Sequence, residues 1–352
     1  MIQTDLLVDS HGRTMRDLRV SVTDRCNFRC MYCLPETEAA LNFYRDRWAN
    51  LPNPSPIARQ WQSSEKILSF EEIERLVRLG AELGIQKIRL TGGEPLLRRQ
   101  LEKLVEKVAR IPGITDLAMT SNGFLFAQQA KALRDAGLQR VSFSLDSLDR
   151  ENFKKITGRD GLDEVLKGID LAQQLGFAPV KINAVVIRGV NDHELEALAD
   201  IARQKNLSFR FIEFMPLDSG RAWQKEHVVP AKEILQRLQT RFALEPVTSD
   251  NKSETAKRWR FADGNGEIGI IAPVSEPFCG QCNRIRLMAD GKIRTCLFSA
   301  GEHDLRALLR DGSDDEAIRN KLRAVVWQKE ARHHIGEPDF VPPQRTMSCI
   351  GG

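Results

Sequence analysis

The sequence predicts an α/β fold in which a partial parallel barrel of six strand–helix units precedes a C-terminal α+β region. The first observation is that short β-branched and aromatic runs alternate with runs of helical periodicity up to residue 242. The second is a change beyond that point to strand-like segments with Gly-rich turns. Strand–helix alternation produces parallel strands, and the loops at their C-terminal ends gather at one edge. We therefore expect functional residues at that edge.

The expected strands are short and apolar, and they span residues 18–23, 87–90, 116–120, 140–145, 180–187 and 208–214. The expected helices carry apolar residues three or four positions apart, and they span residues 70–83, 96–110, 127–136, 162–175, 193–205 and 230–242. Ser69 and Glu72 predict a capping box at the start of the first of these helices. Because a closed eight-unit barrel needs more repeats than these, we expect an open barrel.

Two domains are expected, with residues 1–240 forming the partial barrel and residues 241–352 forming the C-terminal domain. Within the second domain, residues 243–300 are strand-like and residues 303–330 are helical in pattern. Residues 35–66 fit neither period and contain several prolines, so we expect a long loop with some local helix there.

The composition limits the possible classes of function. The chain has 352 residues, of which 41% are apolar and 28% charged, a mix that is typical of globular proteins. The net charge of +4 is spread evenly, which argues against a general nucleic-acid binder. No apolar run approaches the roughly 20 residues that cross a bilayer, and the N-terminus resembles no targeting signal. These features predict a cytoplasmic protein without a membrane or nucleic-acid partner.

Three cysteines lie close together in the segment CNFRCMYC, at Cys26, Cys30 and Cys33. Thiolates at this spacing select zinc or iron–sulfur clusters. A structural zinc ion usually takes four ligands, and no fourth cysteine or histidine follows nearby. Three thiolates on a four-iron cluster leave one iron free to bind a small chelating molecule. A zinc site completed by a distant residue is the alternative.

The CxxxCxxC segment resembles the cluster motif of the radical S-adenosylmethionine (radical SAM) superfamily. The resemblance implies a [4Fe–4S] cluster whose free iron chelates the amino and carboxylate groups of SAM. It also implies SAM contacts at four positions that match motifs of the superfamily, namely Tyr32, Gly93 in TGGEP, Ser144 and Met215.

A second group, Cys279, Cys282 and Cys296, has the spacing C-x2-C-x13-C. Arg284 and Arg286 lie at alternate positions between Cys282 and Cys296, so both face one side of a strand. Their planar guanidinium groups suit phosphate. The group therefore predicts a second open cluster beside a bound polyanion. The alternative is a zinc ribbon completed by a residue such as His303 or Cys349.

The two cysteine groups and several motifs together resemble the GTP 3′,8-cyclase (MoaA) family of molybdenum cofactor biosynthesis. The motifs run from DLRVSVTDRCNFRCMYC through IRLTGGEPLLR, SLDSLD, VKINAVV and RFIEFM to FCGQCNRIRL and the terminal GG. The resemblance implies that the second cluster binds the guanine of GTP. It also implies GTP contacts at Arg19, Arg89, Thr120, Lys181, Arg284, Ile285 and Arg286, which Arg210 could join. Gly351 and Gly352 match a tail that reaches the active site.

The resemblance further implies a lyase reaction in which a 5′-deoxyadenosyl radical removes the hydrogen from C3′ of GTP. The C3′ radical then adds to C8, and the product is (8S)-3′,8-cyclo-7,8-dihydroguanosine 5′-triphosphate. The implied cofactors are two [4Fe–4S] clusters and SAM. The implied partners are GTP, an electron donor and, by pathway, cyclic pyranopterin monophosphate synthase, with the chain acting as a monomer or homodimer.

Two other functions remain open on the residues alone. One is a radical SAM enzyme that modifies peptides and has an auxiliary cluster, although such enzymes usually carry more C-terminal cysteines. The other is a structural metal-cluster protein that binds a nucleotide, which leaves TGGEP unexplained. Residues 35–66 form a longer segment than the family pattern predicts, and Cys349 has no expected role beyond a spare thiol.

Overall fold

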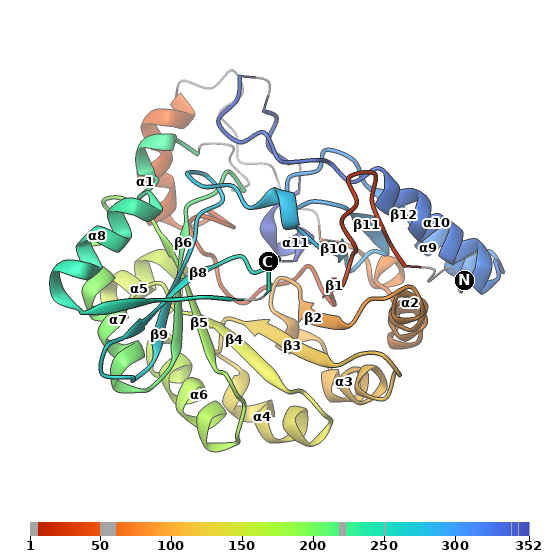
Figure 1. Cartoon of the computed structure of the whole chain (residues 1–352), viewed down its shortest axis with the longest axis horizontal. Coiled ribbons are helices and arrows are strands. Elements are labelled where there is room, and N and C mark those ends of the chain that lie inside the picture. The colour runs from red at the N-terminus through yellow and green to blue at the C-terminus, as the bar shows by residue number, and fades with distance from the viewer. Residues whose placement is uncertain are drawn as a thin grey trace.

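The computed structural model describes residues 6–49, 61–217, 223–249, 251–338, 340–343 and 345–351. Its strands form one 12-stranded sheet in the order β12-β11-β10-β1-β2-β3-β4-β5-β6-β9-β8-β7. The sheet curves into an open arc with helices on its outer side, and α11 (Met347–Ile350) lies inside the arc (Figure 1). The two ends of the sheet, β12 and β7, are not paired with each other. This confirms the expected open barrel.

Six parallel strands form the middle of the sheet in chain order: β1 (Asp17–Ser21), β2 (Lys87–Thr91), β3 (Asp116–Ser121), β4 (Arg140–Ser144), β5 (Lys181–Val186) and β6 (Ser208–Glu213). All six were expected from the sequence within a few residues. Their carboxyl ends lie at one edge of the arc, where the loops of the cysteine, TGGEP and LDS motifs begin.

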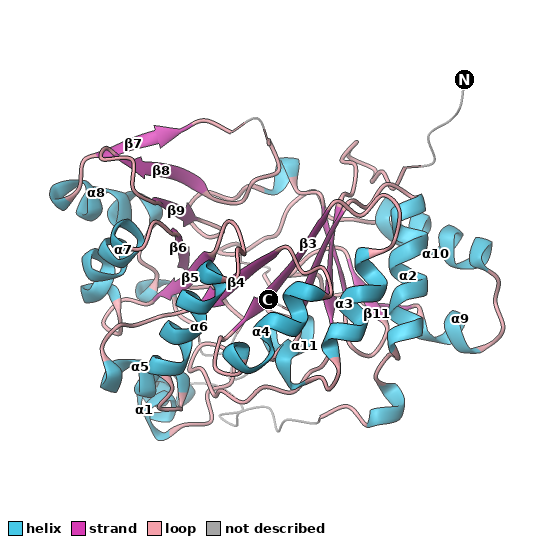
Figure 2. Cartoon of the chain, turned by 90° about the horizontal axis from the view of Figure 1, so that it is seen from below, coloured by secondary structure: helices cyan, strands magenta, loops and turns pink. Residues whose placement is uncertain are grey.

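Helices connect these strands and cover the outer face: α2 (Phe70–Glu82), α3 (Leu101–Ala109), α4 (Phe126–Asp135), α5 (Arg150–Thr157), α6 (Leu162–Gln174), α7 (Leu195–Gln204) and α8 (Ala231–Arg241). Figure 2 shows them beside the strands from a second direction. At α2 the predicted capping box is present, because the Ser69 hydroxyl accepts from the Glu72 amide and the Glu72 carboxylate accepts from the Ser69 amide.

Two expected helices differ in the structure, and one helix was not expected. The helix expected at 96–110 begins at Leu101, because a short 3-10 turn (Pro95–Leu97) precedes it and Gln100 has a φ of 58°. Residues 303–330 divide into β12 (His303–Asp304), α9 (Arg306–Arg310) and α10 (Asp315–Trp327), since Asp314 caps α10. Helix α5 was not expected. Within 35–66, the structure describes α1 (Glu38–Ala49) and a 3-10 turn at Ser64–Lys66, and residues 50–60 lie outside the described part.

The strands beyond residue 241 add to both edges of the barrel sheet. On one edge β9 (Glu267–Ile271) pairs parallel with β6, followed by β8 (Lys257–Phe261) and β7 (Leu244–Val247). On the other edge β10 (Arg284–Leu287) pairs parallel with β1, followed by β11 (Lys292–Arg294) and β12. The expected boundary at residue 240 lies at the end of α8, and the division into two domains stays a prediction.

The main apolar core lies between the strands and the outer helices. It contains side chains that are almost fully buried, such as Leu90, Leu104, Phe143, Ile182 and Phe209. Since apolar residues fill this layer, polar side chains on the inner face of the strands point into the arc. No helix in the described ranges combines the length and the apolar character that crossing a membrane requires.

Candidate active site

A cavity of about 620 Å³ lies inside the arc, a size that is typical of small-molecule sites. Nearly every strand of the barrel contributes a polar or charged residue to its lining. These residues are Arg19, Arg89, Thr120, Ser142, Lys181, Asn183, Arg210, Arg284 and Arg286. Six of the seven expected GTP residues therefore line one cavity, and so does Arg210.

Three of these arginines stand side by side on neighbouring strands. Arg19 of β1 pairs in register with Arg286 of β10 on one side and with Arg89 of β2 on the other. Arg89 is buried and donates hydrogen bonds to the hydroxyls of Thr120 and Ser142, both at 3.1 Å. Within the described chain, the buried Nε atoms of Arg19 and Arg210 have no hydrogen-bond partner. Buried unpartnered donors indicate a ligand with acceptor atoms.

The crowded cations also change the acidity of Lys181. Burial and the positive charges of Arg210, Arg140, Arg89 and Lys87 lower the pKa of Lys181 to about 7. Burial likewise lowers the pKa of Arg89 to about 10, although the neighbouring Asp17 opposes the shift. Because bringing a polyanion into the cavity would relieve this repulsion, the site favours a ligand with several negative charges.

Ile285 is the seventh expected GTP residue, and its side chain does not reach the cavity. It alternates with Arg284 and Arg286 on β10, so it points to the other side of the sheet and is buried in the apolar core. Only the backbone of Ile285 is available to a ligand in the cavity.

The second cysteine group lies at the rim of the same cavity. Cys279, Cys282 and Cys296 all line it. Cys282 precedes β10 and Cys296 follows β11, and the antiparallel pairing of Arg286 with Arg294 brings these ends together. Arg284 donates a hydrogen bond to the Cys282 sulfur at 3.3 Å. Burial raises the pKa of Cys282, but the positive charges of Arg284 and Lys329 outweigh this and lower it to about 7. The thiolate fraction of Cys282 at neutral pH is therefore higher than that of an ordinary cysteine.

Two buried cations hold the backbone of this cysteine group. Arg13 donates to the carbonyl oxygens of Cys279 and Ala331, each at 2.9 Å. Lys329 is 3% exposed and donates to the carbonyl oxygens of Thr295 and Arg284, the latter at 3.1 Å. Neither cation was expected from the sequence, because neither lies in a motif. Arg13 and Cys279 are 266 residues apart, and Lys329 is 45 and 34 residues from its partners Arg284 and Thr295.

The first cysteine group occupies the loop after β1. The amides of Cys33 and Leu34 both donate to the Cys30 carbonyl, at 2.9 and 2.7 Å, which folds the loop into a tight turn. Burial and the negative charges of Asp146, Cys26 and Cys33 raise the pKa of Cys30. Thiols whose charges repel one another in this way are suited to a positively charged iron centre.

Gly93 lies directly against this loop. Its amide donates to the Thr23 carbonyl at 2.9 Å, and an added Cβ would lie 2.3 Å from the Arg25 carbonyl oxygen. No larger residue fits, so the glycine allows the TGGEP loop to support the cysteine loop. Glu94 is buried, and its carboxylate accepts from the Ser121 hydroxyl at 2.9 Å and the Asn122 amide at 2.7 Å. Burial raises the pKa of Glu94 to about 7.

The described residues include no group of three or more His, Cys, Asp or Glu side chains that is placed to hold a single metal ion. In an iron–sulfur cluster each thiolate binds a different iron, so the thiols need not converge on one point. For the second cysteine group, the choice between a cluster and a zinc ion completed by His303 or Cys349 stays a prediction.

Of the remaining expected SAM residues, Ser144 and Met215 lie at the carboxyl ends of strands, and Tyr32 lies in the cysteine loop. Ser144 ends β4 and pairs in register with Asn183 of β5. Met215 follows β6 and lines the cavity. The hydroxyl of Tyr32 donates to the Asp146 carboxylate at 2.7 Å.

Asn183 also lines the cavity, and its buried Oδ1 has no hydrogen-bond partner within the described chain. The sequence did not predict this residue, because a single asparagine in a strand carries no sequence signal.

The C-terminal tail enters the arc near these strand ends. The Gly351 carbonyl accepts a hydrogen bond from Arg286, and an added Cβ on Gly351 would lie 2.5 Å from the Thr91 hydroxyl. Gly352 lies outside the described residues. Cys349 is partly buried in α11, and burial raises the pKa of its thiol.

Comparisons with known proteins agree with this geometry. Residues 20–202 match the radical SAM superfamily, and residues 207–335 match the family described as Molybdenum Cofactor Synthesis C. The chain resembles SuiB of Streptococcus suis in a structure with bound S-adenosylmethionine, with a TM-score of 0.59, 14% identity, and coverage of 88% of this chain and 69% of that one. At this identity the likeness shows the fold.

Curated relatives share far more of the sequence. The GTP 3′,8-cyclase of Rhodopirellula baltica is 45% identical over 98% of this chain and 92% of its own length. The GTP 3′,8-cyclase of Syntrophomonas wolfei is 44% identical over 98% of this chain and 100% of its own length. Both matches span the two cysteine groups and the strands that line the cavity. The chain therefore belongs to the GTP 3′,8-cyclase family of the radical SAM superfamily.

Proposed function

We propose that this protein is a radical SAM GTP 3′,8-cyclase, which joins C3′ of the ribose of GTP to C8 of its guanine. The product is (8S)-3′,8-cyclo-7,8-dihydroguanosine 5′-triphosphate, and the reaction is the first step of molybdenum cofactor biosynthesis. The observation that carries the proposal is the cavity in which arginines from adjacent strands face the second cysteine group. Triphosphate and guanine would then have separate binding elements in one enclosed space.

In this proposal the cationic residues bind the triphosphate. Arg19, Arg89 and Arg286 form a row across three strands, and Lys181 and Arg210 face the cavity from β5 and β6. The unpartnered Nε atoms of Arg19 and Arg210 would donate to phosphate oxygens. Thr120 holds Arg89 in place and is close enough to contact the same ligand. These residues orient the ribose and exclude water, and both roles protect a reactive centre.

The family carries a [4Fe–4S] cluster, and we propose that Cys26, Cys30 and Cys33 hold it and that Tyr32, Gly93, Ser144 and Met215 bind SAM. When bound there, the cluster supplies the electron that cleaves SAM to methionine and a 5′-deoxyadenosyl radical. The loop of the cysteines is held by backbone hydrogen bonds to neighbouring loops, such as the bond from the Glu94 amide to the Arg25 carbonyl at 2.8 Å. A rigid loop keeps the cofactor in one orientation toward the ribose.

We further propose that Cys279, Cys282 and Cys296 hold a second [4Fe–4S] cluster that binds guanine. The support is the set of three partly buried thiols at the cavity rim, the lowered pKa of Cys282, and the buried cations Arg13 and Lys329 around them. Positive charges and N–H donors beside sulfur stabilise an anionic cluster. The Arg284 side chain, which donates to the Cys282 sulfur, would then lie between cluster and nucleotide.

The finer features of the reaction are also proposals. An external electron donor reduces the cluster, and a cyclic pyranopterin monophosphate synthase uses the product. None of the seven cysteines, all of which lie in the described residues, forms a disulfide, and this suits a reducing compartment such as the cytoplasm. A monomer or a homodimer is compatible with an active site formed within one chain.

The proposal is tested with GTP that carries deuterium at C3′. Reduced, cluster-loaded protein is mixed with SAM and the labelled GTP, and the 5′-deoxyadenosine is examined by mass spectrometry. The proposed reaction transfers deuterium from C3′ into 5′-deoxyadenosine. Unlabelled 5′-deoxyadenosine at normal yield would show that hydrogen is taken from another position and would contradict the proposal.

A further inference from the structure

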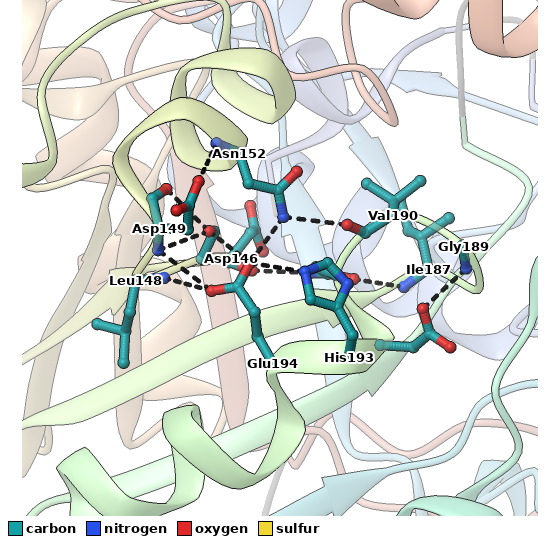
Figure 3. Close-up of polar contacts among 12 residues, drawn as sticks. Asp146, Leu148, Asp149, Asn152, Ile187, Gly189, Val190, His193 and Glu194 are labelled. Atoms are coloured by element: carbon teal, nitrogen blue, oxygen red, sulfur yellow. Dashed lines mark hydrogen bonds and ion pairs between the residues drawn. The ribbon is translucent and has the colours of Figure 1, made fainter.

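One polar network lies beside the first cysteine loop, and it links Asp146 of the SLDSLD motif to residues outside the motifs discussed above. It joins the loop after β4, the loop after β5, and the 3-10 turn Asp192–Glu194 that precedes α7 (Figure 3). Its central groups are Asp146, Asn191 and Glu194, which are 3%, 1% and 8% exposed. Buried polar groups of this kind are retained where they fix a geometry, since leaving any of them unpaired is costly.

The Asp146 carboxylate accepts two hydrogen bonds from different segments. Its Oδ2 accepts from the hydroxyl of Tyr32 at 2.7 Å, and its Oδ1 accepts from the Val185 amide at 2.8 Å. Each oxygen therefore serves one donor. Tyr32 stands between Cys30 and Cys33, so the first of these bonds connects the end of β4 to the cysteine loop.

Asn191 holds the backbone around Asp146. Its side-chain amide donates to the carbonyl oxygens of Asp146 and Val185 at 2.8 and 2.9 Å, and its Oδ1 accepts from the Ile187 amide at 2.8 Å. All the polar atoms of this side chain are thus used to tie the loop after β4 to the loop after β5. The backbone at Asp146, which carries the carboxylate, is therefore held by a segment other than the cysteine loop.

Glu194 completes the network one turn further along. Its carboxylate accepts from the Ser147 hydroxyl at 2.7 Å, the Leu148 amide at 2.8 Å and the Asn152 side chain at 2.6 Å (Figure 3). It thereby anchors the start of α5. The end of α5 braces the cysteine loop, because the Met31 amide donates to the Ile156 carbonyl at 2.9 Å.

We propose that Asp146 is a positioning residue for SAM, acting by holding the ring of Tyr32 in one orientation against the cofactor. The proposal rests on the proposed place of Tyr32 in the SAM site. The network of Asn191 and Glu194 keeps the carboxylate where the tyrosine hydroxyl meets it. Without the bond, the ring would sample other rotamers, and SAM binding would have to restore the order at an entropic cost.

The substitution Asp146→Asn tests the bond with almost no change in shape. Asparagine has one acceptor oxygen, which the Val185 amide requires, so its amide N–H can only donate to the tyrosine oxygen and the charge-assisted bond from Tyr32 is lost. Tyr32→Phe removes the same bond from its other end and deletes one oxygen atom. It keeps the proposal testable if Asp146→Asn does not fold. Glu267→Gln is the matched control. The Glu267 carboxylate also accepts two hydrogen bonds from side chains, those of Ser208 and Arg258. It lies at the start of β9, at the end of the strands opposite to the cysteine loop.

The readout is the dissociation constant of SAM for anaerobic, cluster-loaded protein without GTP, measured beside the melting temperature. Tyr32→Phe and Asp146→Asn are each expected to raise this constant about tenfold, and the double variant no more than either one. Glu267→Gln is expected to lower the melting temperature without changing SAM affinity. Unchanged affinity in Tyr32→Phe, or additive effects in the double variant, would overturn the proposal.

A further variant separates this inference from the proposed site. Tyr32→Ala removes the whole ring and is expected to weaken SAM binding more than Tyr32→Phe does. If Tyr32→Ala leaves the SAM dissociation constant unchanged, the proposed place of Tyr32 in the SAM site is wrong. If Tyr32→Ala weakens binding but Tyr32→Phe and Asp146→Asn do not, the site stands and the role of Asp146 is overturned.

Discussion

Arg286 donates a hydrogen bond to the carbonyl oxygen of Gly351, the last residue that the structure describes. The arginine is buried on β10, two residues beyond Arg284 and four beyond Cys282. The glycine packs against Thr91, where the TGGEP loop begins. Gly351 thus contacts residues next to both proposed cofactor regions: Arg286, on the strand that follows Cys282, and Thr91, at the start of the TGGEP loop.

This contact predicts that Gly351→Ala impairs cyclisation. Gly351 has a φ of 82°, and an added Cβ would lie 2.5 Å from the Thr91 hydroxyl, so the tail must move. Since misplacement by about 1 Å can cost up to roughly 100-fold in rate, we expect the turnover number to fall at least about tenfold. Gly336→Ala is the control, because Gly336 has a φ of 87° but open space around it. Equal rates for the two variants would exclude a role for the tail.

Arg284 is expected to bind GTP without holding either cluster. Arg284→Ala removes a cation from the cavity, and losing a charged hydrogen bond costs about 1.5–3 kcal/mol, or roughly 10- to 100-fold in the dissociation constant. Iron content is expected to stay at the wild-type value. Arg306→Ala, which removes an exposed contact to the Lys66 carbonyl, is the control and is expected to bind GTP normally. An unchanged GTP affinity in Arg284→Ala would remove this residue from the site.

GTP binding is expected to weaken as the pH rises from about 7 to about 9. Burial and neighbouring cations lower the pKa of Lys181 to about 7, so the free protein loses this proton within that range. The triphosphate favours the charged lysine, and binding therefore takes up a proton. In the unfolded chain the pKa of Lys181 is about 10.5, so between pH 7 and pH 9 the unfolded chain holds this proton more often than the folded protein does. The free energy of unfolding of the GTP-free protein is therefore expected to rise with pH across this window.

The measurement is the GTP dissociation constant at both pH values for wild type and Lys181→Arg. The guanidinium stays protonated, so the variant is expected to show a flatter pH dependence than the wild type. Identical slopes for the two proteins would show that another group is responsible.

The two cysteine groups are expected to act separately. Cys279→Ala should lower the iron content from about eight to about four per chain while SAM binding remains. Cys26→Ala should also lower the iron content to about four per chain, but this variant should lose SAM binding and keep GTP binding. Iron analysis and the two binding measurements check this, and loss of both ligands in either variant would mean that the groups do not form independent sites.

Much of the barrel could be predicted because its signals are local. Ser69 and Glu72 form their capping box within one turn, and each expected strand lies within a few residues of its predicted place. Helix α5 had such signals too: Asp149 caps it by accepting from the Asn152 amide, and Gly158 ends it with a φ of 70°. It was missed because its eight residues are few for a visible period.

The parts that could not be predicted depend on long-range pairing. Nothing local indicates that β9 pairs with β6 while β10 pairs with β1, which brings Arg286 next to Arg19. For the same reason Asp146 could not be connected to Tyr32, which lies 114 residues earlier in the chain. The cysteine groups and their flanking arginines were visible as motifs, whereas the residues that hold them in place were not.

The central claim is that two clusters, each held by three cysteines, bind SAM and GTP in one cavity. The most direct measurement purifies the protein without oxygen, counts iron and sulfide, and follows 5′-deoxyadenosine with SAM and dithionite. The account predicts about eight irons per chain and formation of 5′-deoxyadenosine that depends on added GTP. About four irons per chain, or SAM cleavage at the same rate with and without GTP, would contradict it.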